Sequence, residues 1–259
     1  MKTENSSSDE LSHNSDIFIP NISVDCIILG FHAGSINVLL CKFKVSNRWM
    51  LPGSFVAKDE HPDETALRIL KKRTCLHNAY LKQFYFFGRD GSINYDNNKE
   101  ILKRFNDEYP REQWNCNRFI SLAYYALIKH EQIQLLADEH EECAWFNIKE
   151  IPALYPDHKE VLDTALETIR RQIGYIPIGY KLLPEKFTMP ELRNIYESIL
   201  GREIDRRNFQ RKMLSIGYIE ALNEIRKVGP HKSPNLYSFI EKKYEDAEKY
   251  GIQFMSNNF

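Results

Sequence analysis

The chain has 259 residues, of which 42% are hydrophobic, so it can bury the core of one large or two modest domains. Its 35 Lys and Arg against 36 Asp and Glu give a formal net charge of -1, which excludes a protein that is basic over its whole surface. Any nucleic-acid surface must therefore be local. The sequence shows no apolar run of membrane-spanning length and no apolar signal-peptide core, so we expect a soluble cytoplasmic protein with no membrane partner.

The cysteines are odd in number, widely scattered and without CxxC spacing. They are Cys26, Cys41, Cys75, Cys116 and Cys143. This pattern indicates reduced thiols that pack mostly as small core residues, and it favours neither disulfides nor a zinc site. We expect no cofactor.

The first apolar segments follow a polar stretch. Residues 1–18 are rich in Ser, Asn and acids and predict a disordered tail. From Ile22, the runs ISVDCIILGF and INVLLCKF are separated by HAGS, which predicts a strand, a turn and a strand. Asp25 is unusual inside the first strand, and it is either a polar residue of an edge strand or a ligand contact.

The stretch from Arg48 to Leu76, RWMLPGSFVAKDEHPDETALRILKKRTCL, predicts a loop followed by a helix that begins near Pro62. It resembles the Nudix box, in which Gly, five residues, Glu and seven residues precede Arg-Glu-aliphatic, one residue, Glu-Glu, one residue and Gly-aliphatic. Here the pattern starts at Ser54 and finds its acid at Glu60 and its arginine at Arg68. We interpret Glu60 and Arg68 as a structural pair that ties loop to helix.

The remaining charges of the box are replaced. Ile69, Lys72 and Arg73 stand where the resemblance expects glutamates, and their spacing puts them on one helix face. In Nudix hydrolases that face holds Mg²⁺ or Mn²⁺ through carboxylates, whereas two cations here would repel a divalent metal. The sequence therefore predicts no metal site, no catalytic residues and no enzyme activity.

The rest of the first domain alternates strands with one helix. Strands are predicted at 80–87, at 119–128, where the run is apolar enough to be central, and at 144–146; a helix is predicted at 157–173. Residues 91–117 break this rhythm and predict an insertion over a sheet edge. The expected fold is α+β, with a Nudix-like α/β/α sandwich around a mixed sheet over residues 19–175.

A second domain is predicted over 176–245, before a flexible tail at 246–259. Thr188 opens a capping box, Gly201 ends that helix, and Asp205 caps a second helix over 206–215, with Phe209, Met213 and Leu214 facing inward. The runs YIEAL and LYSFI then predict a hairpin that encloses a basic tip. Together these elements predict a winged helix-turn-helix.

The second helix has the side chains that a reader of the major groove needs. Arg can contact guanine, Asn and Gln can contact adenine, and the other cations can contact phosphates. Between 202 and 232 the sequence has eight Lys or Arg and four acids, so this segment is locally basic, although a merely solvated amphipathic helix would show similar charges. The predicted DNA-binding residues are Arg206, Arg207, Asn208, Gln210, Arg211, Lys212, Arg226, Lys227, His231 and Lys232.

A degenerate Nudix box followed by a winged helix resembles the Nudix-related transcriptional regulators of the NrtR and AraR type. The motifs GSFVAKDE, SLAYYALI, IGYKLLPEKFT and DRRNFQRK carry the resemblance, and KDE and YYALI are most similar to the sugar-responsive branch. The resemblance implies a homodimer, formed by the effector-sensing Nudix domain, that binds a palindromic double-stranded operator and represses carbohydrate-utilisation genes.

From their loop positions we predict effector-binding residues for a sugar or sugar-derived compound. They are Phe55, Lys58, Asp59, Arg68, Arg89, Asp90 and His158. His158 could equally form a helix N-terminal cap with Asp157.

Two other hypotheses stay open. One is a Nudix hydrolase acting on a nucleoside diphosphate derivative such as ADP-ribose, with relocated acids at Asp59, Glu60, Asp63 and Glu64. The other is an interaction module whose second domain contacts another protein.

Overall fold

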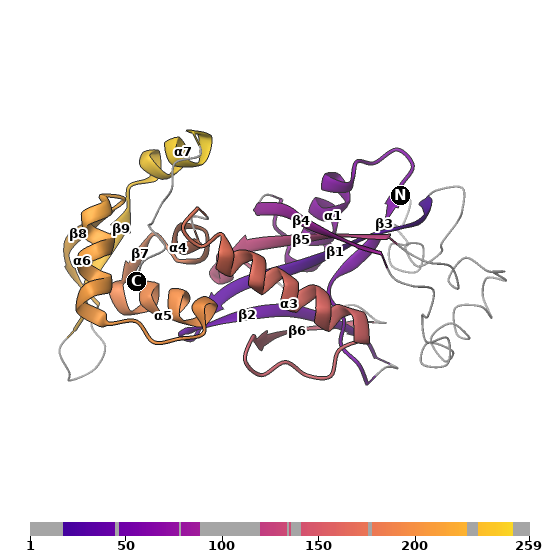
Figure 1. The fold of residues 1–259 in the computed structure, drawn as a ribbon, viewed down its shortest axis with the longest axis horizontal. Helices are drawn as coiled ribbons and strands as arrows, with labels where there is room; N and C mark the ends of the chain where they lie inside the picture. The colour runs from indigo at the N-terminus through magenta and orange to yellow at the C-terminus, as the bar shows by residue number, and fades with distance from the viewer. Residues whose placement is uncertain are drawn as a thin grey trace, which may run out of the picture.

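The computed structural model describes residues 18–44, 47–77, 79–88, 120–133, 135, 141–175, 178–226 and 233–250. Most of the predicted N-terminal tail, the 91–117 insertion and the residues after 250 therefore lie outside the described residues, as does Cys116. The described part forms an elongated molecule, with a large sheet at one end and a smaller domain at the other (Figure 1).

The large sheet is mixed, as predicted. Its order is β4-β5-β1-β2-β6, with β3 also pairing with β1. β1 pairs in parallel with β5 and antiparallel with β2 and β3. The strands are β1 (Phe18–His32), β2 (Ser35–Phe43), β3 (Gly53–Ala57), β4 (Tyr80–Gly88), β5 (Ile120–Ile128) and β6 (Glu141–Asn147).

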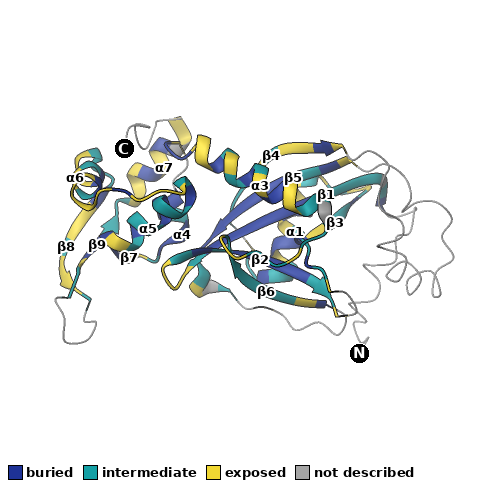
Figure 2. Cartoon of the chain, turned by 60° about the horizontal axis from the view of Figure 1, so that its bottom comes forward, coloured by how far each residue is buried: buried dark blue, intermediate teal, exposed yellow. Residues whose placement is uncertain are grey.

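Two helices cover opposite faces of this sheet, because the side chains of β1 are apolar on both sides. Cys26 and Ile28 pack in the cluster beneath α1 (Pro62–Thr74), whereas Ile27 and Leu29 pack in the cluster beneath α3 (Pro156–Arg171). The central strands are the most deeply buried elements in Figure 2. The predicted α/β/α sandwich is confirmed, including the central position of β5.

The smaller domain is a winged helix, as predicted. A three-stranded sheet of order β7-β9-β8 lies beside the helices. The elements are α4 (Ile178–Leu182), β7 (Lys186–Thr188), α5 (Met189–Leu200), α6 (Arg206–Ile216), β8 (Ile219–Ile225), β9 (Asn235–Phe239) and α7 (Glu241–Tyr250). Thr188 forms the predicted capping box with Glu191, and Gly201 ends α5 at a φ of 68°.

The two domains share one apolar core. The cluster beneath α3 continues into Ile178, Leu192 and Tyr196 of the winged helix. At the same junction, Arg170 Nε of α3 donates to the Ile199 carbonyl of α5 over 2.8 Å. The two domains are therefore joined by apolar packing and by this hydrogen bond.

Three sequence interpretations need correction, and one stretch contains elements that were not predicted. The stretch 178–188 forms α4 and β7, because its apolar residues are buried in the shared core. The predicted flexible tail begins inside α7, where Ala247 is buried. Leu214 is 36% exposed instead of inward-facing, since Phe209 and Met213 already fill the inner face. Asp25 lies on a central strand, not on an edge.

Within the described ranges, none of the helices has the length and apolar character needed to cross a membrane.

Candidate functional site

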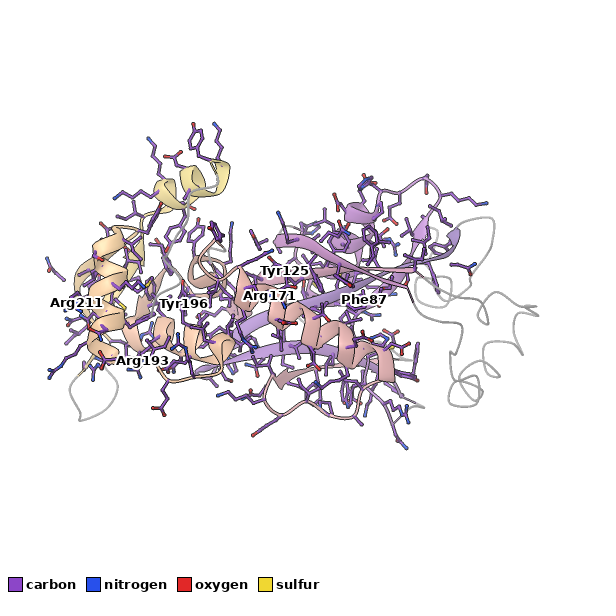
Figure 3. All side chains as sticks on the ribbon, viewed as in Figure 1. Phe87, Tyr125, Arg171, Arg193, Tyr196 and Arg211 are labelled. Carbon is purple, nitrogen blue, oxygen red and sulfur yellow. The ribbon has the colours of Figure 1, made fainter. Side chains whose placement is uncertain are left out.

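Helix α6 projects a polar face at one end of the molecule. Asp205 caps it by accepting from the Asn208 amide over 2.8 Å, and Phe209 and Met213 anchor it in the core. Arg206, Arg207, Asn208 and Arg211 are exposed. Figure 3 shows Arg211 at the end of the molecule farthest from the large sheet. There α6 is open to a large partner.

The face borders an open hollow of about 610 Å³. Its lining comes from the turn between α5 and α6 and from one stripe of α6: Arg202, Glu203, Ile204, Asp205, Asn208, Arg211, Lys212 and Ser215. Arg211 Nη2 donates to Asn208 Oδ1 over 2.8 Å, which aligns the two side chains. Sequence reasoning did not select Arg202 and Ser215, although the spacing 208, 211, 212, 215 is that of one helix face.

Gln210 does not belong to that exposed face. Its Nε2 donates to the Tyr237 hydroxyl of β9 over 3.2 Å, and the side chain is half-buried. In this structure Gln210 therefore joins the helix to the hairpin, and its contact with a base stays a prediction.

Arg226 also has partners within the domain, and its contact with DNA stays a prediction. It lies at the base of the hairpin, where its guanidinium donates to Glu191 Oε1 over 2.5 Å and to the Lys186 carbonyl over 3.0 Å. This bond fixes the hairpin against the start of α5, because Glu191 also accepts from the Thr188 amide. Lys227, His231 and Lys232, predicted at the tip, lie outside the described residues.

In the large domain, Glu60 and Arg68 hold the loop before α1. Arg68 donates to both Glu60 carboxylate oxygens over 2.8 and 2.9 Å, to Ser54 Oγ and to the Phe55 carbonyl. Thr65 adds a hydrogen bond to Glu60 over 2.8 Å. The structural interpretation of the pair is confirmed.

These bonds make the stability of the loop depend on pH. Burial by itself raises the pKa of Glu60, but the hydrogen bonds from Arg68 and Thr65 and the Arg68 charge outweigh it and lower that pKa from 4.5. The folded pKa lies below the unfolded one, so this stabilisation is complete above pH 4.5 and is lost as pH falls through the folded value.

We expect Glu60→Gln to lower the free energy of unfolding by about 1–3 kcal/mol at neutral pH, because charge-assisted bonds are lost. The difference from the natural chain should shrink as pH falls below 4.5 towards the lowered pKa of Glu60. Urea unfolding at a series of pH values measures both effects, with the exposed Asp59→Asn as the matched control. A difference that stays constant down to pH 3 would contradict this account.

Three of the four acids of the hydrolase hypothesis are held in structural bonds. Glu64 accepts from the His61 amide in the α1 capping box, and Asp63 accepts from the Tyr124 hydroxyl over 2.6 Å. Asp59 is exposed, and Glu60 is bound to Arg68. Three of the four carboxylates therefore have other partners.

The helix positions that would bind a metal in a Nudix hydrolase do not fit one here. Ile69 is buried in the core beneath α1, and the guanidinium of Arg73 is paired with the Glu141 carboxylate of β6. A divalent cation would meet an aliphatic side chain and fixed positive charge at these places. Among the described residues, no group of three or more His, Cys, Asp or Glu is placed to hold a metal ion.

The predicted effector residues that the structure describes divide into two groups. Arg68 and His158 have structural partners. His158 Nδ1 accepts from the Leu51 amide over 2.9 Å, and Arg68 donates to the Phe55 carbonyl. Phe55, Lys58 and Asp59 lie together on β3 and the turn that follows it. Arg89 and Asp90 lie outside the described residues.

Comparison with known proteins decides the family. The family profile described as "NUDIX domain" matches residues 20–165, more than half of the chain. The chain belongs to the Nudix family. A second profile, "NrtR DNA-binding winged helix domain", matches residues 179–239. This Nudix protein therefore carries an NrtR-type winged helix after its Nudix domain.

A curated relative and two solved structures match along most of the chain. The "ADPR responsive transcriptional repressor NtrR" of Acinetobacter baylyi is 26% identical over 238 residues, which are 89% of this chain and 86% of the relative. A crystal structure of Shewanella oneidensis NrtR complexed with a 27mer DNA has a TM-score of 0.65 at 22% identity, covering 86% and 95% of the two chains. A MutT/nudix family protein from Enterococcus faecalis has a TM-score of 0.60 at 22% identity, covering 85% and 88%.

Proposed function

We propose that this Nudix protein is a ligand-responsive transcriptional repressor that binds DNA through its winged helix. The observation that carries the proposal is the open polar face of α6, with exposed Arg207, Asn208 and Arg211, on a domain of the NrtR DNA-binding type. Exposed arginine and amide groups on the second helix of a helix-turn-helix suit contacts to base edges and phosphates. The hairpin, which Arg226 fixes to Glu191, contacts α6 through the hydrogen bond between Gln210 and Tyr237.

The effector we propose is ADP-ribose or a compound of that class. Support comes from the A. baylyi relative, which is named as ADPR-responsive and aligns along most of this chain. A free sugar and the control of carbohydrate genes remain predictions that none of these relatives supports. For the site we propose the β3 turn, where Phe55 can stack on a flat ring and Lys58 can contact a phosphate.

We further propose that the Nudix domain binds its effector without hydrolysing it. Arg73 and Ile69 replace the carboxylates that would hold a metal in a Nudix hydrolase, and Glu60, Asp63 and Glu64 have structural partners. Calorimetry with ADP-ribose, with and without Mg²⁺, tests this: we expect binding that does not need the metal and no release of AMP. Metal-dependent turnover would restore the hydrolase alternative.

DNA binding is tested by fluorescence anisotropy of the full chain against duplexes tiled across the DNA beside its own gene, with excess competitor. We expect one palindromic tile to bind tightly and in a salt-dependent way, with two chains per duplex if the predicted homodimer forms. If no tile binds above competitor at either of two salt concentrations, the protein-interaction alternative replaces the operator proposal.

A further inference from the structure

Cys41 of β2 and Cys143 of β6 face each other across neighbouring antiparallel strands. Their Sγ atoms lie 2.6 Å apart, and both are thiols in this structure. The amide and the carbonyl of Cys41 are both bonded to Met50, over 2.9 and 2.7 Å. Cys41 and Cys143 must therefore form a non-hydrogen-bonded pair, in which the Cα atoms approach to about 4.5 Å. That separation falls in the range that a disulfide spans.

The two sulfurs differ in access to solvent. Cys41 is fully buried, whereas Cys143 is half-buried at the edge of the sheet. The contact with Cys143, followed by burial, raises the pKa of Cys41. Because Cys143 is the more exposed of the two, it is the sulfur that a small oxidant reaches first, and the guanidinium of Arg73 lies near both sulfurs.

We propose that Cys41 and Cys143 form a redox site that a hydroperoxide converts into an intramolecular disulfide. The Cys143 thiolate attacks the peroxide, its sulfur becomes a sulfenic acid, and the O–O bond breaks with release of an alcohol, or of water from hydrogen peroxide. The Cys41 sulfur then attacks the Cys143 sulfur, loses its proton and displaces the hydroxyl as water. Two thiols and one hydroperoxide thus give one disulfide, one alcohol or water, and one further water.

The bond would close a covalent ring through residues 41–143, which contain the whole Nudix-box loop and α1. It would also fix the edge strand β6 to β2, beside the Arg73–Glu141 ion pair. Closing a ring of this length restricts the unfolded chain, so the oxidised protein should melt at a higher temperature.

The test treats the full chain with a small excess of hydrogen peroxide and maps its peptides without reduction. We expect a peptide pair joined through Cys41 and Cys143, loss of two titratable thiols, and a rise in Tm of about 5 °C or more that a dithiol reverses. Cys143→Ser should abolish the linked pair and the rise in Tm, while the matched control Cys75→Ser should keep both.

Other outcomes overturn the proposal. A linked pair that uses Cys75 or Cys116 would show that the cross-strand sulfurs are not the reactive ones. Oxidation of Cys143 to a sulfinic acid without a link to Cys41 would show that the buried thiol cannot attack. A rise in Tm that survives Cys143→Ser would assign the effect to another group.

Discussion

Arg211→Ala is expected to weaken operator binding by about 1–3 kcal/mol, roughly 5- to 150-fold in Kd, and Arg207→Ala by a similar amount. Both side chains are exposed on α6, and Arg211 is aligned by Asn208, so their removal should subtract DNA contacts without disturbing the core. Fluorescence anisotropy with the selected operator and with single-base variants gives the Kd values.

The pattern of loss separates two roles. If an arginine reads a base, its variant should lose discrimination at one operator position; if it contacts a phosphate, binding should weaken for all sequences and the salt slope should fall by about one. Lys159→Ala on α3 is the matched control, because it removes an exposed cation paired with Asp163 far from α6. Unchanged Kd values for both arginine variants would refute the assigned surface.

Arg73→Ala should lower the free energy of unfolding by about 3–5 kcal/mol. The side chains of Arg73 and Glu141 are only 10% and 8% exposed, so the variant would leave a buried carboxylate without its cationic partner. Urea unfolding of the full chain measures the loss. The matched control is Lys71→Ala, an exposed cation on the same helix, which should stay within about 0.5 kcal/mol of the natural chain.

A double variant distinguishes the loss of the Arg73–Glu141 ion pair from a general loss of packing in the core. Arg73→Met combined with Glu141→Leu replaces the ion pair by apolar side chains of similar size, and it should be more stable than Arg73→Ala alone. If Arg73→Ala unfolds no more easily than Lys71→Ala, the pair contributes nothing. The interpretation that the Arg73–Glu141 ion pair holds α1 to β6 would then be wrong.

Sequence periodicity predicted the strands and helices well where local signals and burial agree. The capping residues Thr188 and Asp205 and the left-handed Gly201 predicted α5 and α6 almost to the residue. α4 and α7 were missed because they are short and their stability comes from packing. For example, the ring of Tyr244 in α7 stacks on the ring of Tyr180 in α4, with 5.0 Å between the ring centroids. A one-dimensional pattern does not contain such contacts.

In the candidate sites, too, features set by local sequence were predicted and features set by tertiary contacts were not. Exposure of Arg207 and Arg211 follows from helical spacing, so the sequence predicted the α6 face. The partners of Gln210 and Arg226 could not be predicted, because Tyr237 and Glu191 are distant in sequence and meet them only through the fold. For the same reason, the pairing of Cys41 with Cys143 depends on the register of β2 and β6.

We propose that this chain binds an operator and that a ligand of its Nudix domain changes that binding. The most direct measurement is operator anisotropy of the full chain titrated with ADP-ribose, with arabinose in a parallel series. We predict that saturating ADP-ribose raises the operator Kd at least tenfold, a coupling of about 1.4 kcal/mol. Superimposed binding curves with and without either compound, for a protein that binds its operator, would contradict the claim.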